Sequence, residues 1–367
     1  MAQIRERPDG RFEIRIYVPT IKGGKERKSF YADSKKEAKI LANKIETDIA
    51  EGKYIPTDKT TLKNYINIWY EIKKKTIELT TQESYEIYIN KHINPALGDM
   101  MLQKIKPLNI QDFYNTMIEN GYSANTIKHV NAVLNQVFEF ALDNDLLKSN
   151  PLRKVSKPKV EKFKPTVCKT EHYKKISESI NDTAILTAIV LAARAGLRRG
   201  EILGLRWSDI DFSSKTISIN QVLIRAKKQL QFKDHPKTER SKRTFRLDDL
   251  TIEILNRQKT EQDKNINKHG KSYLNYDLVV CRENGKFIRP DNLSEIFSKI
   301  RDKNKLDNLR LHDLRHFNAT MMAKLGIDVK TASARFGDRT DTMLEIYTHS
   351  LEEMDQDAAA KIGTLLN

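Results

Sequence analysis

The segment from Leu311 to His349 contains residue types that suit chemistry on a phosphate group. His312 and Arg315 are three residues apart, so they share one face if this segment is helical. Both side chains can donate hydrogen bonds to non-bridging phosphate oxygens. Tyr347 follows in a short apolar-flanked segment, and a tyrosine hydroxyl can attack phosphorus to form a covalent intermediate. A structural interpretation, with His312 packed, Arg315 paired with an acid and Tyr347 in the core, fits this segment about equally well.

Two upstream segments add further cations. Arg198 lies in the sequence G-L-R-R-G-E, which separates two runs of apolar residues at helical spacing. Glycine lets the backbone approach a ligand closely there, and Glu201 can orient Arg198 or cap the next helix. Residues 235–244 form a basic turn that contains Lys237, between two strand-like runs. Each segment alone is more typical of a charged surface turn, so the functional interpretation depends on their combination.

In combination, the segments G-L-R-R-G-E, P-K-T, H-D-L-R-H and L-E-I-Y-T-H resemble, in that order, the tyrosine recombinase (phage integrase) family. The resemblance covers the C-terminal half at the level of motifs. The arrangement of the N-terminal half resembles integrases of phages and conjugative transposons. The resemblance implies that Tyr347 is the nucleophile. It also implies that the catalytic cluster comprises Arg198, Lys237, His312 and Arg315.

One site position, Asp338, departs from the family pattern. The family usually has a histidine, or sometimes a tryptophan, at this place before the tyrosine. An ionised carboxylate only accepts hydrogen bonds, and it repels a phosphate. Protonation is the least expected outcome, because neighbouring arginines favour the ionised form. We expect Asp338 either to turn away and bind Arg335 or Arg339, or to orient His312 or an arginine, with activity reduced but not abolished.

The resemblance implies a site-specific DNA recombinase that integrates and excises a mobile element or prophage through a 3′-phosphotyrosyl intermediate. Arg198 and Arg315 would hold the non-bridging oxygens, and Lys237 would protonate the leaving 5′ hydroxyl. No cofactor or metal is expected, because arginines neutralise the charge. Two alternatives remain: a type IB topoisomerase-like relaxing enzyme, and a catalytically weakened DNA-binding relative, which Asp338 supports. The basic N-terminal segment argues against a relaxing enzyme, which needs no second DNA site.

Composition points to a nucleic-acid partner. The chain has 367 residues, a formal net charge of +16 and a pI of about 9.5. A chain this basic is expected to bind a polyanion, most commonly nucleic acid. Cys168 and Cys281 are far apart, so we predict neither a disulfide framework nor a zinc site. Without a signal peptide or a membrane-spanning run, we expect a cytoplasmic location on DNA, with no membrane partner.

We predict an α+β fold, mainly α, whose first part is a DNA-binding domain over residues 1–56. Alternating apolar residues at 12–18 and flanking turn signals predict a three-stranded sheet. Ser34 with Glu37 then begins a helix as a capping box. A sheet with arginines on one face can enter a DNA groove, and the unit resembles an arm-binding domain. The candidate contacts are Arg5, Arg7, Arg15, Arg27 and Lys28.

Residues 57–155 are predicted to form a helical core-binding domain, which in the family clamps the duplex opposite the catalytic domain. Four apolar stripes predict four helices, the first beginning at Thr61 and the second ending before Pro95. The opposite faces carry lysines that can neutralise phosphates. The candidate contacts here are Lys73, Lys74 and Lys128. Residues 152–165, rich in lysine and proline, are typical of a linker.

Residues 166–367 are predicted to form the catalytic domain, with helices mixed with a short antiparallel sheet. Strand signals occur at 209–212, 216–220, 221–224 and 244–247, with Lys237 at the tip of a turn. The tail, residues 351–366, packs either on its own chain or on a neighbouring protomer. The expected partners are double-stranded DNA with core-type and arm-type sites, and three further copies in a tetramer on DNA. An excisionase or a host DNA-bending protein is a further candidate.

Overall fold

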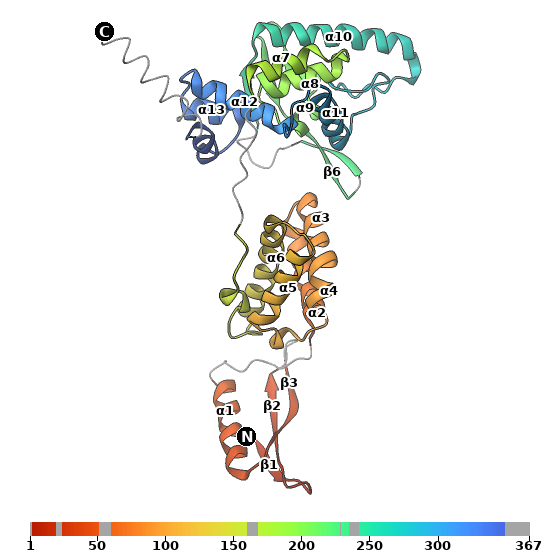
Figure 1. Ribbon diagram of the computed structural model, residues 1–367. Coiled ribbons are helices and arrows are strands. Elements are labelled where there is room, and N and C mark those ends of the chain that lie inside the picture. Colours follow the sequence, from red (N-terminus) through yellow and green to blue (C-terminus); the bar gives the residue numbers. More distant parts are fainter. Residues whose placement is uncertain are drawn as a thin grey trace, which may run out of the picture. The chain divides into compact units, whose positions relative to one another are not determined.

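The computed structural model describes residues 2–19, 24–50, 60–159, 168–227, 229–234 and 242–348. The chain divides into two units, residues 1–162 and 163–367. Helices dominate and the sheets are small and antiparallel, which confirms the predicted fold class (Figure 1). The boundaries of the three predicted domains stay predictions. Within the described ranges, no helix is both long enough and apolar enough to span a bilayer.

Residues 2–50 form a three-stranded sheet with a helix on one face (Figure 1). Its elements are β1 (Gln3–Glu6), β2 (Phe12–Pro19), β3 (Lys25–Ala32) and α1 (Lys35–Ala50). Ile14, Ile16 and Val18 alternate along β2 and are buried, because successive strand residues point to opposite faces. They pack against α1. The Ser34 hydroxyl accepts a hydrogen bond from the Glu37 amide at 3.2 Å, as the capping pattern predicts.

The helical part of the first unit comprises α2 (Leu62–Lys73), α3 (Leu79–Ile87), α4 (Asn94–Leu97), α5 (Pro107–Glu119) and α6 (Ala124–Asp143). Short 3-10 turns lie at Lys74–Thr76, Leu102–Lys104 and Pro151–Lys154. The first helix begins at Thr61 as predicted, with Thr61 as the N-cap of α2. The expected end before Pro95 is wrong, because a π-helical turn at Tyr88–Ile93 leads directly into α4. Pro95 lies in the first turn of α4, where a missing backbone N–H costs little.

The second unit contains α7 (Thr170–Glu178), α8 (Thr183–Arg194), α9 (Arg199–Gly204), α10 (Asp249–His269), α11 (Pro290–Lys303), α12 (Leu311–Lys324) and α13 (Val329–Phe336). Residues 340–348 are also helical, and 3-10 turns lie at Trp207–Asp209 and Gly270–Ser272. Helix α8 is buried along residues 184–193, so apolar residues surround it on every side. The core around α8 supports the ends of α8 and α12, where the predicted site residues lie.

Two small antiparallel sheets complete the second unit. One has the order β4 (Ile210–Asp211), β5 (Thr216–Ile219) and β8 (Arg243–Arg246), and the other pairs β6 (Val222–Ala226) with β7 (Gln229–Lys233). Sequence reasoning missed β7. The signal was the alternation Q-L-Q-F-K after a turn at Lys227, whose φ of 50° is left-handed. The predicted turn with Lys237 lies outside the described residues.

Candidate active site

The junction between α8 and α9 places Arg198. Gly196 has a φ of +67°, and a Cβ atom on it would lie 2.9 Å from the Phe336 ring, so this turn requires glycine. Arg198 then occupies the N-cap position of α9. Glu201 accepts hydrogen bonds from the Arg198 amide at 2.9 Å and from its Nη1 at 2.7 Å. The predicted orientation of Arg198 by Glu201 is therefore present.

Arg315 projects from α12 into the core beneath Arg198. Its side chain is 4% exposed and donates to the carbonyl oxygens of Gly196 and Phe336, the latter at 3.0 Å. Its guanidinium carbon lies 4.6 Å from the centre of the Phe336 ring, a cation–π contact. Burial, followed by the charge of Arg198, lowers the pKa of Arg315 to about 10. The group is still cationic at neutral pH.

A third arginine, which the sequence did not single out, completes the cluster. Arg243 on β8 donates two hydrogen bonds to Glu201, at 2.8 and 3.1 Å. Arg315 Nη1 lies 3.9 Å from the same carboxylate. Burial raises the pKa of Glu201, but the Arg243 hydrogen bonds and the charges of the three arginines outweigh it, and the pKa falls below its usual value. In the sequence, Arg243 is only an arginine next to a predicted strand, and no local pattern marks it as buried.

Asp338 lies between the two predicted phosphate-binding arginines. Its Oδ1 accepts a hydrogen bond from Arg198 Nη2, and its Oδ2 accepts one from Arg315 Nη2 at 2.5 Å. Of the two expected outcomes, the structure shows the orientation of an arginine, and the pairing with Arg335 or Arg339 is wrong. Arg335 donates to the Arg246 carbonyl at 2.9 Å, and Arg339 pairs with Asp341 at 3.0 Å. Gly337, in the left-handed region, ends α13 and turns the chain towards the cluster.

His312 lies at the start of α12, one turn before Arg315, with an exposed edge. Its ring is 4.7 Å from that of His316, edge to face. Partial removal from water lowers its pKa to about 4, and the charges of His316 and Arg315 act in the same direction. His312 is therefore neutral at pH 7. It lines a hollow of about 410 Å³ together with Leu197, the neighbour of Arg198.

Tyr347 lies in the helical turns at 340–348, packed on a small cluster that includes Phe336 and Met343. Its hydroxyl donates a hydrogen bond to the Ile327 carbonyl at 3.0 Å. Removal from water, and then the charge of Asp328, raise its pKa above the usual value. Phe336 belongs to this cluster and also contacts Arg315, so it links the tyrosine to the arginine cluster. The Tyr347 oxygen, however, is bonded to the backbone instead of to an arginine.

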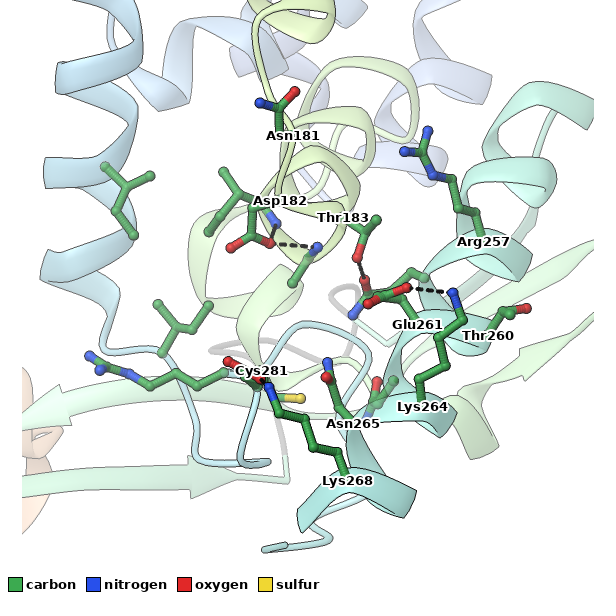
Figure 2. Close-up of a pocket in the computed structure, with 18 of the residues that line it drawn as sticks. Asn181, Asp182, Thr183, Arg257, Thr260, Glu261, Lys264, Asn265, Lys268 and Cys281 are labelled. Carbon is green, nitrogen blue, oxygen red and sulfur yellow. Dashed lines mark hydrogen bonds and ion pairs between the residues drawn. The ribbon is translucent and has the colours of Figure 1, made fainter.

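The second unit also has a hollow of about 1300 Å³ between the start of α8, α10 and the segment around Cys281 (Figure 2). None of the predicted site residues that the structure describes lines it. Several of its polar groups are already paired, including Thr183 with Gln258 at 2.6 Å and Lys264 with Glu261 at 3.0 Å. Volume alone therefore does not locate the chemistry. The arginine cluster is identified by its convergent charges.

The N-terminal sheet carries basic residues on the face opposite α1. Arg5 and Arg15 donate to Glu13 between them, at 2.7 and 3.0 Å. The Arg15 hydrogen bond is the largest effect that lowers the pKa of Glu13, to about 2. The guanidinium of Arg7 lies 5.2 Å from the ring centre of Tyr31, which is 48% exposed. This face therefore combines cations with an exposed aromatic ring, as nucleic-acid-binding surfaces do.

The remaining predicted DNA contacts differ in their positions. Arg27 lies on the same outer face and donates to Gln3 at 2.9 Å. Lys28 lies directly across from Ile16, so its side chain is on the α1 face, where it pairs with Glu26 at 2.8 Å. In the helical part, the remaining candidates are Lys73 at the end of α2, Lys74 paired with Glu71 at 2.6 Å, and exposed Lys128 on α6.

Family profiles and related sequences match both units of the chain. The profile of the phage integrase family matches residues 167–354, and that of the phage integrase N-terminal SAM-like domain matches residues 61–118. The tyrosine recombinase XerC-like protein of Caldanaerobacter subterraneus subsp. tengcongensis is 29% identical over 92% of each chain. The ICEBs1 integrase of Bacillus subtilis is 24% identical over 99% of this chain and 100% of its own length.

Solved structures show the same fold. The Tn1549 transposon integrase in complex with a circular intermediate DNA superposes with a TM-score of 0.69 at 18% identity, over 81% of this chain and 99% of that chain. A lambda integrase tetramer bound to a Holliday junction gives 0.60 at 18% identity, over 94% of each chain. The first family profile spans half of the chain and includes the arginine cluster. The chain therefore belongs to the phage integrase family and is a tyrosine-type site-specific DNA recombinase.

Proposed function

We propose that this recombinase cleaves duplex DNA with the Tyr347 hydroxyl and holds the scissile phosphate with Arg198 and Arg315. One observation carries the assignment: both guanidinium groups donate to a single carboxylate, that of Asp338. Two permanently charged forks that meet at one anion are suited to two oxygens of a phosphate. They would stabilise the negative charge that develops on the five-coordinate phosphorus.

The proposed step conserves atoms and bond energy. The Tyr347 oxygen forms a bond to phosphorus, the bond from phosphorus to the 5′ oxygen breaks, and a 3′-phosphotyrosyl link results. Neutral His312 helps to accept the tyrosine proton, and Lys237 protonates the departing 5′ oxygen. A 5′ hydroxyl from another strand then reverses the step, so rejoining needs no external energy source.

The free chain is not yet arranged for attack. The Tyr347 hydroxyl is bonded to the Ile327 carbonyl, and its pKa is raised. The tyrosine must leave this carbonyl before its oxygen reaches a phosphate between Arg198 and Arg315. Residues 337–339, which connect α13 to the turns at 340–348 and are not helical, would be the place where the backbone rotates. We infer that the described structure is a resting form.

The proposed biological reaction is integration and excision of a mobile element or prophage in a bacterial cytoplasm. Four copies would act on two duplexes, with residues 1–56 on arm-type sites and the rest of the chain on core-type sites. An excisionase or a host DNA-bending protein would set the direction. The Tn1549 and lambda enzymes named above were solved on DNA, which supports this proposal by analogy. The relatives named above match nearly the full chain, which does not favour a relaxing enzyme.

A nicked suicide substrate, made from the DNA that flanks the gene, tests the assignment. Tyr347→Phe should bind this DNA but form no covalent adduct on denaturing electrophoresis. Tyr276→Phe is a matched control, because Tyr276 is a 44% exposed tyrosine of the same unit outside the cluster, and it should keep adduct formation. Adduct formed by Tyr347→Phe would refute the nucleophile. Strand exchange between two sites separates recombination from relaxation.

A further inference from the structure

Asp338 engages the two arginines that the proposed function assigns to the scissile phosphate. Arg198 uses Nη1 for Glu201 and Nη2 for Asp338. Arg315 uses Nη1 for the Gly196 carbonyl, and Nη2 for Asp338 and the Phe336 carbonyl. The terminal nitrogens of both groups are therefore already engaged. An arriving phosphate oxygen meets a carboxylate oxygen on each of them.

We propose that Asp338 is a placeholder anion: it positions Arg198 and Arg315 before DNA binds, and the scissile phosphate then displaces it. This inference rests on the proposed roles of the two arginines. Its first support is electrostatic. Two guanidinium groups that face the same point repel each other unless an anion lies between them. A carboxylate offers two acceptor oxygens in a planar group, which matches the hydrogen bonds that two phosphate oxygens would accept.

Displacement follows because two anions cannot share one site at hydrogen-bonding distance. The position of Asp338 allows it to leave. Its side chain is 19% exposed, whereas those of Glu201 and Arg315 are 1% and 4% exposed. Glu201 therefore remains as the permanent buried partner of the cluster, and Asp338 is the carboxylate that can exchange.

The structure also has a hollow beside Asp338 that would hold the displaced carboxylate. The hollow has a volume of about 720 Å³ and lies between β8 and α13, and Ser333 and Thr340 help to line it. The Ser333 hydroxyl is buried and has no hydrogen-bond partner among the described residues. Ser333 would supply a donor to a carboxylate that moves into this hollow once the segment shifts, because its hydroxyl at present lacks an acceptor in the described part of the chain.

The location of Asp338 in the chain links this exchange to the nucleophile. Asp338 follows Gly337 at the end of α13 and lies two residues before the helical turns that carry Tyr347. A displaced Asp338 moves the segment whose rotation the tyrosine needs in order to leave the Ile327 carbonyl. The arrival of phosphate would therefore release the nucleophile, and the free protein would stay inactive towards other substrates.

Inorganic phosphate tests the placeholder without any knowledge of the DNA site. The full chain, Asp338→Asn and Asp341→Asn are compared by thermal unfolding in phosphate and in chloride at equal ionic strength. Asp341 is a matched control, because it is an exposed aspartate of the same segment that pairs with Arg339. Asp338→Asn should be less stable in chloride and should gain more stability from phosphate than the other two proteins. Equal gains in all three would overturn the proposal.

Cleavage of the suicide substrate supplies a reading that a merely structural role would not produce. At saturating DNA, Asp338→Asn should form adduct severalfold faster than the unmodified chain, because the phosphate no longer competes with a charge. Asp341→Asn should match the unmodified chain. If Asp338→Asn forms adduct at the same rate as the unmodified chain or more slowly, the phosphate does not displace Asp338 and the proposal is overturned. If neither the variants nor the unmodified chain form adduct, the proposed function fails. The phosphate experiment then still shows whether Asp338 is a placeholder anion.

Discussion

Arg243 and Glu201 form an ion pair that is almost completely removed from water. Arg243 Nη2 lies 2.8 Å from Glu201 Oε2, and their side chains are 5% and 1% exposed. Arg243 Nε also donates to the Arg335 carbonyl at 2.7 Å, in the last turn of α13. This one arginine therefore connects β8, α9 and α13 around the pair Arg198 and Arg315.

Removal of Arg243 should strongly destabilise the second unit. Arg243→Met leaves the Glu201 carboxylate buried with one hydrogen-bonded arginine fewer, and breaking a buried pair in this way costs about 3 kcal/mol or more. Urea unfolding measures the loss. Lys264→Met is the matched control, because its pair with Glu261 is 68% and 43% exposed and should be worth at most about 1 kcal/mol. Similar losses of unfolding free energy for both variants would show that the buried ion pair stabilises the unit no more than the exposed pair does.

The two phosphate-binding arginines should differ in their structural roles. Arg198→Ala and Arg315→Ala should each slow cleavage by ~10²-fold, because each removes one charged contact in the transition state. Arg315→Ala should also lower the free energy of unfolding more than Arg198→Ala does. It leaves the carbonyls of Gly196 and Phe336 without their buried donor, whereas the Arg198 side chain is 34% exposed.

Adduct formation, DNA binding and unfolding are measured for both variants. Binding should fall much less than cleavage, because many other phosphate contacts remain. An Arg198→Ala protein that loses binding and cleavage in the same proportion would show that this arginine only positions DNA. Equal unfolding free energies for the two variants would contradict the structural role of Arg315.

The lowered pKa of His312 predicts a dependence of stability on pH. Its pKa is about 4 in the folded chain, against an ordinary value of about 6.5. Between these values the unfolded chain binds more protons than the folded chain, so stability falls as the pH is lowered from 6.5 to 4. Above pH 6.5 both states are neutral at this residue, and its contribution no longer changes.

His312→Gln should therefore flatten the fall in unfolding temperature over this acid range and leave the neutral range little changed. His316, whose pKa is also lowered, continues to contribute in both proteins. The measurement is thermal unfolding of the full chain and of the variant at a series of pH values. Parallel curves from pH 4 to 6.5 would show that the histidine titrates normally in the folded chain.

The face assignment of the N-terminal sheet predicts opposite outcomes at two adjacent residues. Arg27 lies on the outer face and Lys28 on the α1 face. Arg27→Gln should weaken binding to arm-site DNA and reduce the slope of log K against log salt by about 1, because one phosphate contact is lost. Lys28→Gln should leave both quantities nearly unchanged. The reverse result would place DNA on the face that carries Lys28.

Local patterns in the sequence were sufficient for many of the elements. A helix begins at Thr61 and Ser34 caps another, both as predicted, and Ile14, Ile16 and Val18 alternate on β2. These features depend on periods of 3.6 or 2 residues and on hydrogen bonds within one turn, so a short segment carries all the information. The same local logic failed at Pro95, where the chain continues through a π-helical turn into α4.

The sequence by itself determined the residue types of the site and the order of its motifs. Their partners were decided only by the tertiary structure. Asp338 bonds to Arg198, 140 residues away, and Arg243 to Glu201, 42 residues away, and no periodicity connects such positions. The hydrogen bond of Tyr347 to Ile327 and the lowered pKa of His312 also depend on which helices pack together. Desolvation and Coulomb interactions act through space, so the protonation and pairing of these groups are properties of the folded unit and not of any segment.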